Sequence, residues 1–421
     1  MSERINRVVF TEEMKKEYTI LVPNMLPVHI ELMCRVMNYN GYHTELLKNG
    51  GDEVKKCGLK YVHNDTCYPA LLIIGQFIDA LQSGKYDTHK VALLITQTGG
   101  GCRASNYLSL LRKALAKAGY EYIPCISLNF SGLEKNPGFK LTVPLIIRLM
   151  YGVIFGDLLM LLKNQCIPYE IRKGETEEKE EIWFEKIARL LTEKHISYKK
   201  IKGYYRDIIE DFDSIERSKE RKIRVGIVGE IFVKFSPLGN NDLEKFLVSE
   251  NAEVVMPGLL DFCLYCVYNA RVDSKLYGTN KIKAAGAAIV DKFILKKQRD
   301  LIDLINENGH FRAVTPFEHT RTLTEGYIGH GAKMGEGWLL TAEMLELVEQ
   351  GVSSIVCAQP FGCLPNHIMG KGMMKPIKEK HEGVSIVAID YDPGATKINQ
   401  ENRIKLMLAN ANLNAEIASG Q

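Results

Sequence analysis

Several signals that would assign this chain to a class of protein are weak or missing. The 421 residues include 54 Lys and Arg and 51 Asp and Glu, a net charge of only +3, so the chain lacks the cationic footprint of a nucleic-acid-binding protein. The opening residues, MSERINRVVFTEEMKKEY, contain no apolar segment followed by a cleavage site, and we expect no secretory signal. The longest apolar stretch, residues 141–162, is interrupted by Pro144, Arg148 and Asp157, which favours a buried helix over a membrane span. We therefore expect a cytoplasmic protein without a nucleic-acid or membrane partner.

The usual phosphate-binding loops are also missing. A P-loop needs Lys and then Ser or Thr directly after its glycines, and a dinucleotide-binding loop needs the spacing G-x-G-x-x-G. The stretch TQTGGGCRASNY at residues 96–107 has neither spacing, and VGIVGEIFVKF at 225–235 lacks the full pattern. Turn geometry explains these glycines better than nucleotide binding does.

The segments that are present alternate between apolar strands and helices. YTILVPN at residues 18–24, HKVALLITQT at 89–98 and EYIPCISLN at 121–129 read as strands with helices between them. A second run of strands begins with KIRVGIVG at residue 222 and ends with VSIVAIDYD at 384–392. Strands that are almost wholly apolar and alternate with helices predict parallel sheets covered on both faces. We expect an α/β fold with two or more Rossmann-like or flavodoxin-like domains.

A change in composition divides the two runs of strands. Residues 175–221 are rich in charged residues, and apolar Ile182, Trp183, Ile187, Leu190 and Leu191 recur there at helical spacing, which predicts a helical connector with a solvated outer face. The expected divisions are an N-terminal α/β domain at 1–166, the connector at 167–221 and a C-terminal α/β domain at 222–421.

Three of the ten cysteines occupy matching local contexts. Cys67 lies in KYVHNDTCYPALL, Cys102 in LLITQTGGGCRASNY and Cys363 in SSIVCAQPFGCLPNHI. Each context reads as an apolar strand, a short turn, the cysteine and the start of a helix. Such turns gather at the carboxyl ends of parallel strands, where ligands bind, and helix N-termini favour thiolate over thiol. In a cytoplasmic chain this pattern indicates metal ligation rather than disulfides.

The number of cysteines favours one kind of metal site. A structural zinc site closes with four ligands, whereas a [4Fe–4S] cluster on three thiolates keeps one iron open for chemistry. Gly101 and Gly362 precede two of the sulfurs and would let backbone N–H groups approach a cofactor. Arg103 could stabilise an anionic cluster or a thioester, although a salt bridge would explain it equally well. The pair Cys263 and Cys266 reads as packing within a buried apolar helix.

A glycine-rich segment at residues 318–338, EHTRTLTEGYIGHGAKMGEGW, concentrates polar side chains on one loop. Loops of this kind carry binding and acid–base residues. We expect His330 or Glu336 to face the crevice that holds the cysteines. The alternative is a surface loop that caps the helix beginning near Leu339.

Three segments together resemble the 2-hydroxyacyl-CoA dehydratase subunit family. They are VHNDTCYPALLIIGQFIDAL, LLITQTGGGCRASNY and QPFGCLPNHIMGKGMMKPIKEKHEGVSIVAIDYDPGATKINQENRIKLML. The likeness covers about residues 18–408 and is strongest to the branch related to CoA-substrate-specific enzyme activases, in which this module also occurs fused behind activase domains. The resemblance implies a [4Fe–4S] cluster near a domain junction, with Cys67, Cys102 and Cys363 as its ligands.

The resemblance also implies partners and a reaction. Family members receive a low-potential electron from a separate ATP-hydrolysing activase, and the dehydratases use it to form a ketyl radical from an (R)-2-hydroxyacyl-CoA thioester. A related branch carries a double-cubane cluster and reduces small molecules. Four hypotheses remain open: a dehydratase-like component, a double-cubane reductase, a non-catalytic iron–sulfur partner of an activase, and a zinc-stabilised scaffold. The expected assembly is a homodimer or a heterodimer.

Overall fold

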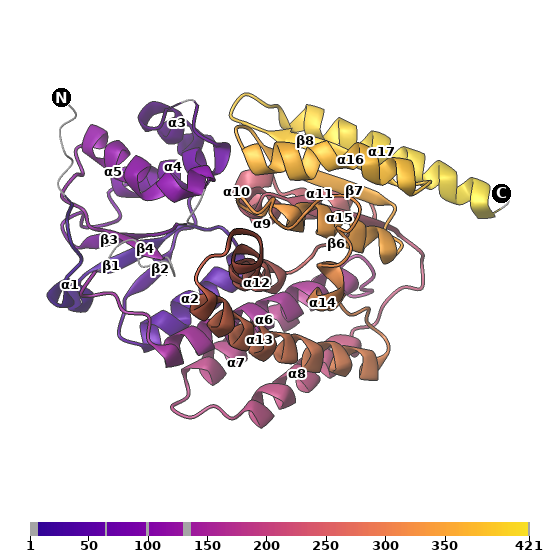
Figure 1. Ribbon diagram of the computed structural model, residues 1–421, viewed down its shortest axis with the longest axis horizontal. Coiled ribbons are helices and arrows are strands. Elements are labelled where there is room, and N and C mark those ends of the chain that lie inside the picture. Colours follow the sequence, from indigo (N-terminus) through magenta and orange to yellow (C-terminus); the bar gives the residue numbers. More distant parts are fainter. Residues whose placement is uncertain (1–6, 64, 98–100, 129–135, 420–421) are drawn as a thin grey trace.

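The computed structural model describes residues 7–63, 65–97, 101–128 and 136–419. Two four-stranded sheets, each parallel throughout, have the strand orders β2-β1-β3-β4 and β6-β5-β7-β8. Helices flank both sheets (Figure 1). The expected α/β class with two Rossmann-like or flavodoxin-like domains is confirmed.

The first sheet lies near the N-terminus. Its strands are β1 (Thr19–Val22), β2 (Thr44–Leu46), β3 (Val91–Thr96) and β4 (Cys125–Leu128). Its helices are α1 (Glu12–Glu17), α2 (Pro27–Tyr39), α3 (Asp52–Tyr61), α4 (Tyr68–Gln82) and α5 (Tyr107–Ala118), and a 3₁₀ turn, η1 (Arg103–Asn106), precedes α5. Strand β3 is central and buried along most of its length, which explains why its sequence is apolar without alternation.

The second sheet repeats the arrangement later in the chain. Its strands are β5 (Ile223–Gly229), β6 (Ala252–Val255), β7 (Ser354–Pro360) and β8 (Ser385–Tyr391). Its helices are α9 (Ile231–Phe235), α10 (Pro237–Asn240), α11 (Leu243–Ser249), α15 (Trp338–Glu349), α16 (Met374–Lys380) and α17 (Lys397–Ser419), with short turns η2 (Asn366–Gly370) and η3 (Lys371–Met373) after β7. Strand β7 is buried at every residue.

A layer of long helices lies beside the two sheets (Figure 1). It contains α6 (Val143–Cys166), α7 (Glu175–Thr192), α8 (Tyr198–Asp213), α12 (Leu259–Tyr277) and α13 (Lys281–Asn308), and the short α14 (Phe317–Thr320) follows. The expected connector corresponds to α7 and α8, which pack on α6, while α7 also packs on α2. Four of its five predicted apolar positions are buried, whereas Ile182 is exposed. Part of the C-terminal half joins the same layer, since α12 contacts α6 and α13 contacts α8.

Helix α6 explains the long apolar stretch in the sequence. Among the described residues it is the one helix long and apolar enough to cross a membrane, and 61% of its most apolar window is buried inside the protein. This helix packs against α2, α7, α8 and α12, as expected of a core helix. The expectation of a buried helix is borne out.

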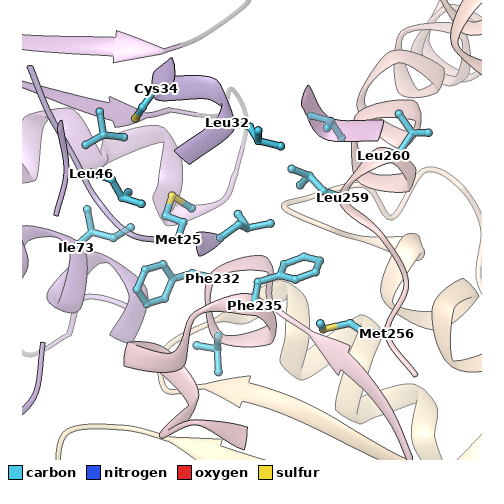
Figure 2. Packing of buried hydrophobic residues seen from close by; sticks show 14 of the residues in the cluster. Met25, Leu32, Cys34, Leu46, Ile73, Phe232, Phe235, Met256, Leu259 and Leu260 are labelled. Carbon is cyan, nitrogen blue, oxygen red and sulfur yellow. The ribbon is translucent and has the colours of Figure 1, made fainter. Parts of the chain in front are cut away.

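One apolar core runs across the junction of the two halves. Phe232 and Phe235 of α9 belong to the same cluster as Met25 and Ile73 from the first half, as Figure 2 shows. Helix α10 contacts α4, and the Ser236 hydroxyl donates to the carbonyl of Asn24 at 3.0 Å. This junction brings the segments that follow β3 and β7 toward each other.

Candidate metal centre at the junction of the two sheets

Each of the three predicted cysteines stands directly before a helical segment. Cys67 is the N-cap of α4, Cys102 is the N-cap of η1, and Cys363 lies in the turn between β7 and η2. The context of Cys67 corrects one expectation, because residues 59–61 form the last turn of α3 instead of a strand. The charged sequence from Asp52 is amphipathic and continues helically through this segment, so the apolar residues at its end belong to the helix.

The three sulfurs share one environment. The backbone N–H groups of Ala70, Ala104 and Asn366 lie against the sulfurs of Cys67, Cys102 and Cys363, respectively, and each lowers the pKa of its thiol. Cys102 also interacts electrostatically with both of the other cysteines. The structure thus brings two sulfurs of the first half and one of the second half into one region at the junction of the halves, which we call the cysteine crevice.

Burial dominates the ionisation of these thiols. Loss of solvent raises the pKa of Cys102 to about 11, raises that of Cys67 and raises that of Cys363 well above its usual value. The expected shift toward thiolate is therefore wrong for the metal-free protein, because three backbone N–H groups do not compensate for desolvation. A metal that binds here would displace the thiol protons.

Gly362 controls the turn that carries Cys363. Its φ is +74°, and a Cβ atom added there would lie 3.2 Å from the Cα atom of Cys67. Beside it, the N–H group of Tyr68 at the start of α4 donates to the carbonyl of Phe361 at 2.9 Å. A side chain at position 362 would strain the backbone and push the turn away from α4.

The other two residues proposed to contact a cofactor lie at the rim of the crevice. The N–H group of Gly101 points at the Met334 sulfur, 3.1 Å away. Arg103 is exposed, and its charge makes a small contribution that lowers the pKa of Cys67. The loop containing Met334 continues to Gly335, where an added Cβ atom would lie 3.7 Å from the Cys102 sulfur. This loop therefore lies against Gly101 and Cys102.

Two buried carboxylates face the cysteines. Glu336 accepts a hydrogen bond from the N–H group of Ile231 at 3.0 Å, and Glu230 accepts one from Val233 at 3.0 Å. Both carboxylates interact electrostatically with Cys102 and Cys363. Burial, followed by the charge of Glu336, raises the pKa of Glu230 to about 8, and burial also raises the pKa of Glu336.

A tyrosine completes the buried side of the crevice. The Tyr107 hydroxyl lies 3.2 Å from the Cys67 sulfur, and its side chain is buried at the start of α5. Burial raises the pKa of Tyr107 well above its usual value, so this hydroxyl keeps its proton and can donate a hydrogen bond to a thiolate at Cys67. Neither Tyr107 nor Glu230 was predicted; the position of Glu230 directly after the apolar strand β5 was the available signal.

His330 does not share the environment of Glu336. Its Nε2 atom lies 2.9 Å from the carbonyl of Arg321, which requires Nε2–H to donate, and its ring packs 4.3 Å from the Trp338 ring. Burial lowers the pKa of His330. The imidazole supports the glycine-rich loop, and none of its described interactions reaches the cysteines.

The pair on α12 differs from expectation. Cys266 is exposed and Cys263 is half-buried, whereas Leu264 and Tyr265 occupy the buried face of the helix. Core packing is therefore wrong for Cys266. Desolvation by nearby protein atoms and the charge of Glu336 raise the pKa of its thiol.

The candidate centre therefore unites Cys67, Cys102 and Cys363 with Glu336, and adds Glu230 to the residues that the sequence indicated. It contains only side chains and backbone groups that come from loops at strand ends and from helix N-termini. Comparison of the chain with protein-family models and with curated proteins finds no match.

Proposed function

We propose that this protein is a cytoplasmic iron–sulfur redox protein that holds a [4Fe–4S] cluster on Cys67, Cys102 and Cys363. The observation that supports it is the gathering of three cysteine sulfurs from both halves of the chain, two of them on buried residues and one on the half-buried Cys102. Each sulfur lies against the first N–H groups of a helical segment. The electron source is a separate ATP-dependent activase, as the resemblance to the 2-hydroxyacyl-CoA dehydratase family suggests.

The donor set has the chemistry of a cluster site, since its three members are thiols. Among the residues that the structure describes, no three His, Cys, Asp or Glu side chains are grouped as the ligands of one metal ion. A cubane spaces its ligands by the width of the whole cluster, so its sulfurs need not be that close. Thiolate is the usual ligand of such clusters, and hydrogen bonds to sulfur and exclusion of water tune their potential.

A cluster bound there would accept one low-potential electron and keep one iron available for a substrate. The protein residues have defined tasks around it. Tyr107 donates a hydrogen bond to the Cys67 sulfur, the loop through Met334 limits the access of water, and the pair Glu230 and Glu336 holds a proton at a carboxylate oxygen near the crevice. These arrangements suit a dehydratase-like reaction on a CoA thioester, in which electron and proton movements must be controlled together.

A double-cubane reductase of a small molecule is the second candidate. Cys266 favours it, because its thiol is exposed on α12 and interacts electrostatically with Glu336 of the same crevice. Extra sulfurs beside the first three are what a larger cluster would need. A third candidate, a non-catalytic iron–sulfur partner of an activase, needs the same cluster but no substrate.

Anaerobic iron and sulfide analysis with low-temperature EPR tests these alternatives. About four irons per chain support the single cubane and about eight the double cubane. The variants Cys67→Ala, Cys102→Ala and Cys363→Ala should each lose most of the iron and sulfide, while Cys57→Ala, which alters a half-buried thiol in α3, should not. Full iron content in all three variants would refute the proposed site.

Activity assays separate an enzyme from a carrier. With activase, ATP and a reductant present, a catalytic protein consumes reductant when an (R)-2-hydroxyacyl-CoA or a small reducible substrate is added. A chain that contains the cluster but consumes no reductant with either class is the non-catalytic partner.

A further inference from the structure

Four buried glutamates lie between the cysteines and residues at the surface, and the charge of each acts on the next; we refer to them, with Lys234, as the acid column. Glu343 and Glu346 lie on one face of α15, about one turn apart, and Glu336 lies in the loop directly before Gly337, the N-cap of this helix. Glu230 precedes α9 and Lys234 lies within it. All five side chains are buried, at 8% exposure or less.

Hydrogen bonds, one ion pair and charge interactions connect the members of the column. At the crevice, Glu230 and Glu336 share the N-terminus of α9 through Val233 and Ile231. In the middle, the Lys234 ammonium contacts Glu343 at 2.9 Å, and its charge also acts on Glu336.

The outer end of the column approaches solvent. The Thr320 hydroxyl donates to Glu346 at 3.2 Å, and the Gln350 amide donates to Glu346 at 3.1 Å. The same amide donates to the Thr315 hydroxyl at 2.9 Å. Thr315 and Gln350 are partly exposed, so a proton can enter the column beside them.

The charges of the column do not balance. Four ionised carboxylates against one ammonium would leave a large negative charge in a buried region, and such a charge is too costly to desolvate. The protein must therefore hold protons here. Burial and the charge of Glu343 raise the pKa of Glu346 to about 7, and burial raises the pKa of Glu343. A carboxyl group that titrates near neutral pH can both receive and release a proton.

Further titratable groups face the column from neighbouring elements, and none of them is a cation. They therefore supply no positive charge that would stabilise ionised carboxylates in the column. They are Asp261, Tyr265 and Cys266 on α12, Cys357 on β7, and Cys102 and Cys363 at the crevice.

We propose that the acid column carries one proton from the surface to the cysteine crevice for each electron that arrives there. This inference rests on the proposed function, because the electron is the one that the activase supplies. The electron adds one negative charge, and a carboxylate oxygen of the Glu230–Glu336 pair forms one O–H bond. The proton comes from a hydronium ion in solvent and passes by way of Glu346 and Glu343, so the charge of the buried region does not change.

The first test uses the metal-free chain. Infrared spectra near neutral pH should contain bands of protonated carboxylic acids in a dry environment, and Glu346→Gln should remove one of them. Glu349→Gln is the matched control, because Glu349 lies on the same helix but is exposed and paired with His319. Spectra without such bands would overturn the proposal.

The second test follows proton uptake in the iron-loaded chain with a pH-indicator dye after rapid reduction by dithionite. Wild type and Glu349→Gln should take up about one proton per electron. Glu346→Gln should take up the same amount at least about tenfold more slowly, because one step of the path is missing. Equal rates in Glu346→Gln and wild type, or no uptake, would overturn the proposal.

A second variant and the iron content of the chain make the result of these tests unambiguous. Thr320→Val removes the hydroxyl that donates to Glu346 within an isosteric side chain, and it should also slow proton uptake, so it replaces Glu346→Gln if that variant does not fold. A chain that binds no iron refutes the proposed function and the coupling together, whereas a chain that binds iron but takes up no proton refutes the coupling alone.

Discussion

At the scale of single residues, Gly362 combines a backbone conformation that favours glycine with close packing against Cys67 of the candidate site. Replacing it with Ala should cost about 1–2 kcal/mol of unfolding free energy, because its φ of +74° disfavours a side chain. The new Cβ would also press on Cys67, so Gly362→Ala should lower the iron content. Gly383→Ala is the control, with a φ of +81° and open space around its Cβ. Urea denaturation and iron analysis distinguish the two; equal iron content in both variants would show that the turn does not position the cysteines.

Glu230 leads to a prediction about pH. Its pKa is raised from 4.5 to about 8 in the folded protein. Between pH 4.5 and pH 8, Glu230 is therefore ionised in the unfolded chain but still protonated in the folded one. Stability should therefore be highest below about pH 4.5 for this group and should fall as pH rises toward 8. Glu230→Gln removes this loss and should be more stable than wild type by about 1–3 kcal/mol above pH 8.

Urea denaturation of the metal-free protein across this pH range measures the effect of Glu230. The exposed Glu382 provides the control, since Glu382→Gln should follow the wild-type curve. If Glu230→Gln and wild type lose the same stability between pH 5 and pH 8, the carboxyl group of Glu230 does not hold a proton in the folded state.

At the scale of elements, Asp157 joins a helix of the first half to a helix of the second. Its two carboxylate oxygens accept the N–H groups of Leu259 and Leu260 at the start of α12, both at 2.8 Å, and one of them also contacts His29 at 2.9 Å. Asp157→Asn replaces one acceptor with a donor and removes a charge from the helix N-terminus, which should cost about 2–3 kcal/mol.

Thermal and urea unfolding check this contact. The control is Asp303→Asn, at an exposed position on α13, which should change the stability by less than about 0.5 kcal/mol. Equal stability of the two variants would mean that water satisfies the start of α12 as well as Asp157 does.

The elements also show how far the sequence could predict the fold. The strands of both sheets were predictable because buried parallel strands carry apolar residues on both faces, as in β3 and β7. The end of α3 was not, because Leu59, Tyr61 and Val62 alternate with Lys60 in a stretch of strand length, and only the preceding charged helix indicates that residues 59–61 are helical. The packing of α7 and α8 against α6 was not predicted either. The sequence shows that each helix has a charged outer face and an apolar inner face, but it does not show which other helix the inner face contacts.

At the scale of the whole molecule, the cysteine crevice was predictable in part and the acid column was not. Cys67, Cys102 and Cys363 each follow a turn and precede the start of a helix, and this local pattern can be recognised from the sequence without knowledge of the fold. Glu343 and Lys234 have no such pattern, because the burial of a charged residue depends on a partner 109 residues away. Long-range pairing of this kind follows from how α9 meets α15, which local sequence does not encode.

The position of the cysteines predicts how a bound cluster affects the whole chain. Cys67 and Cys102 belong to the first half and Cys363 to the second, and one apolar core already runs across the junction. A cluster that binds only the folded chain should raise its thermal midpoint while unfolding remains a single transition, with a gain of about 3 kcal/mol or more. Differential scanning calorimetry before and after anaerobic reconstitution measures this gain.

Cys363→Ser should abolish the gain in thermal midpoint and Cys57→Ser should retain it, because only the first removes a sulfur that links the halves. A loaded chain that melts in two steps with an unchanged midpoint would show that the cluster does not bridge them.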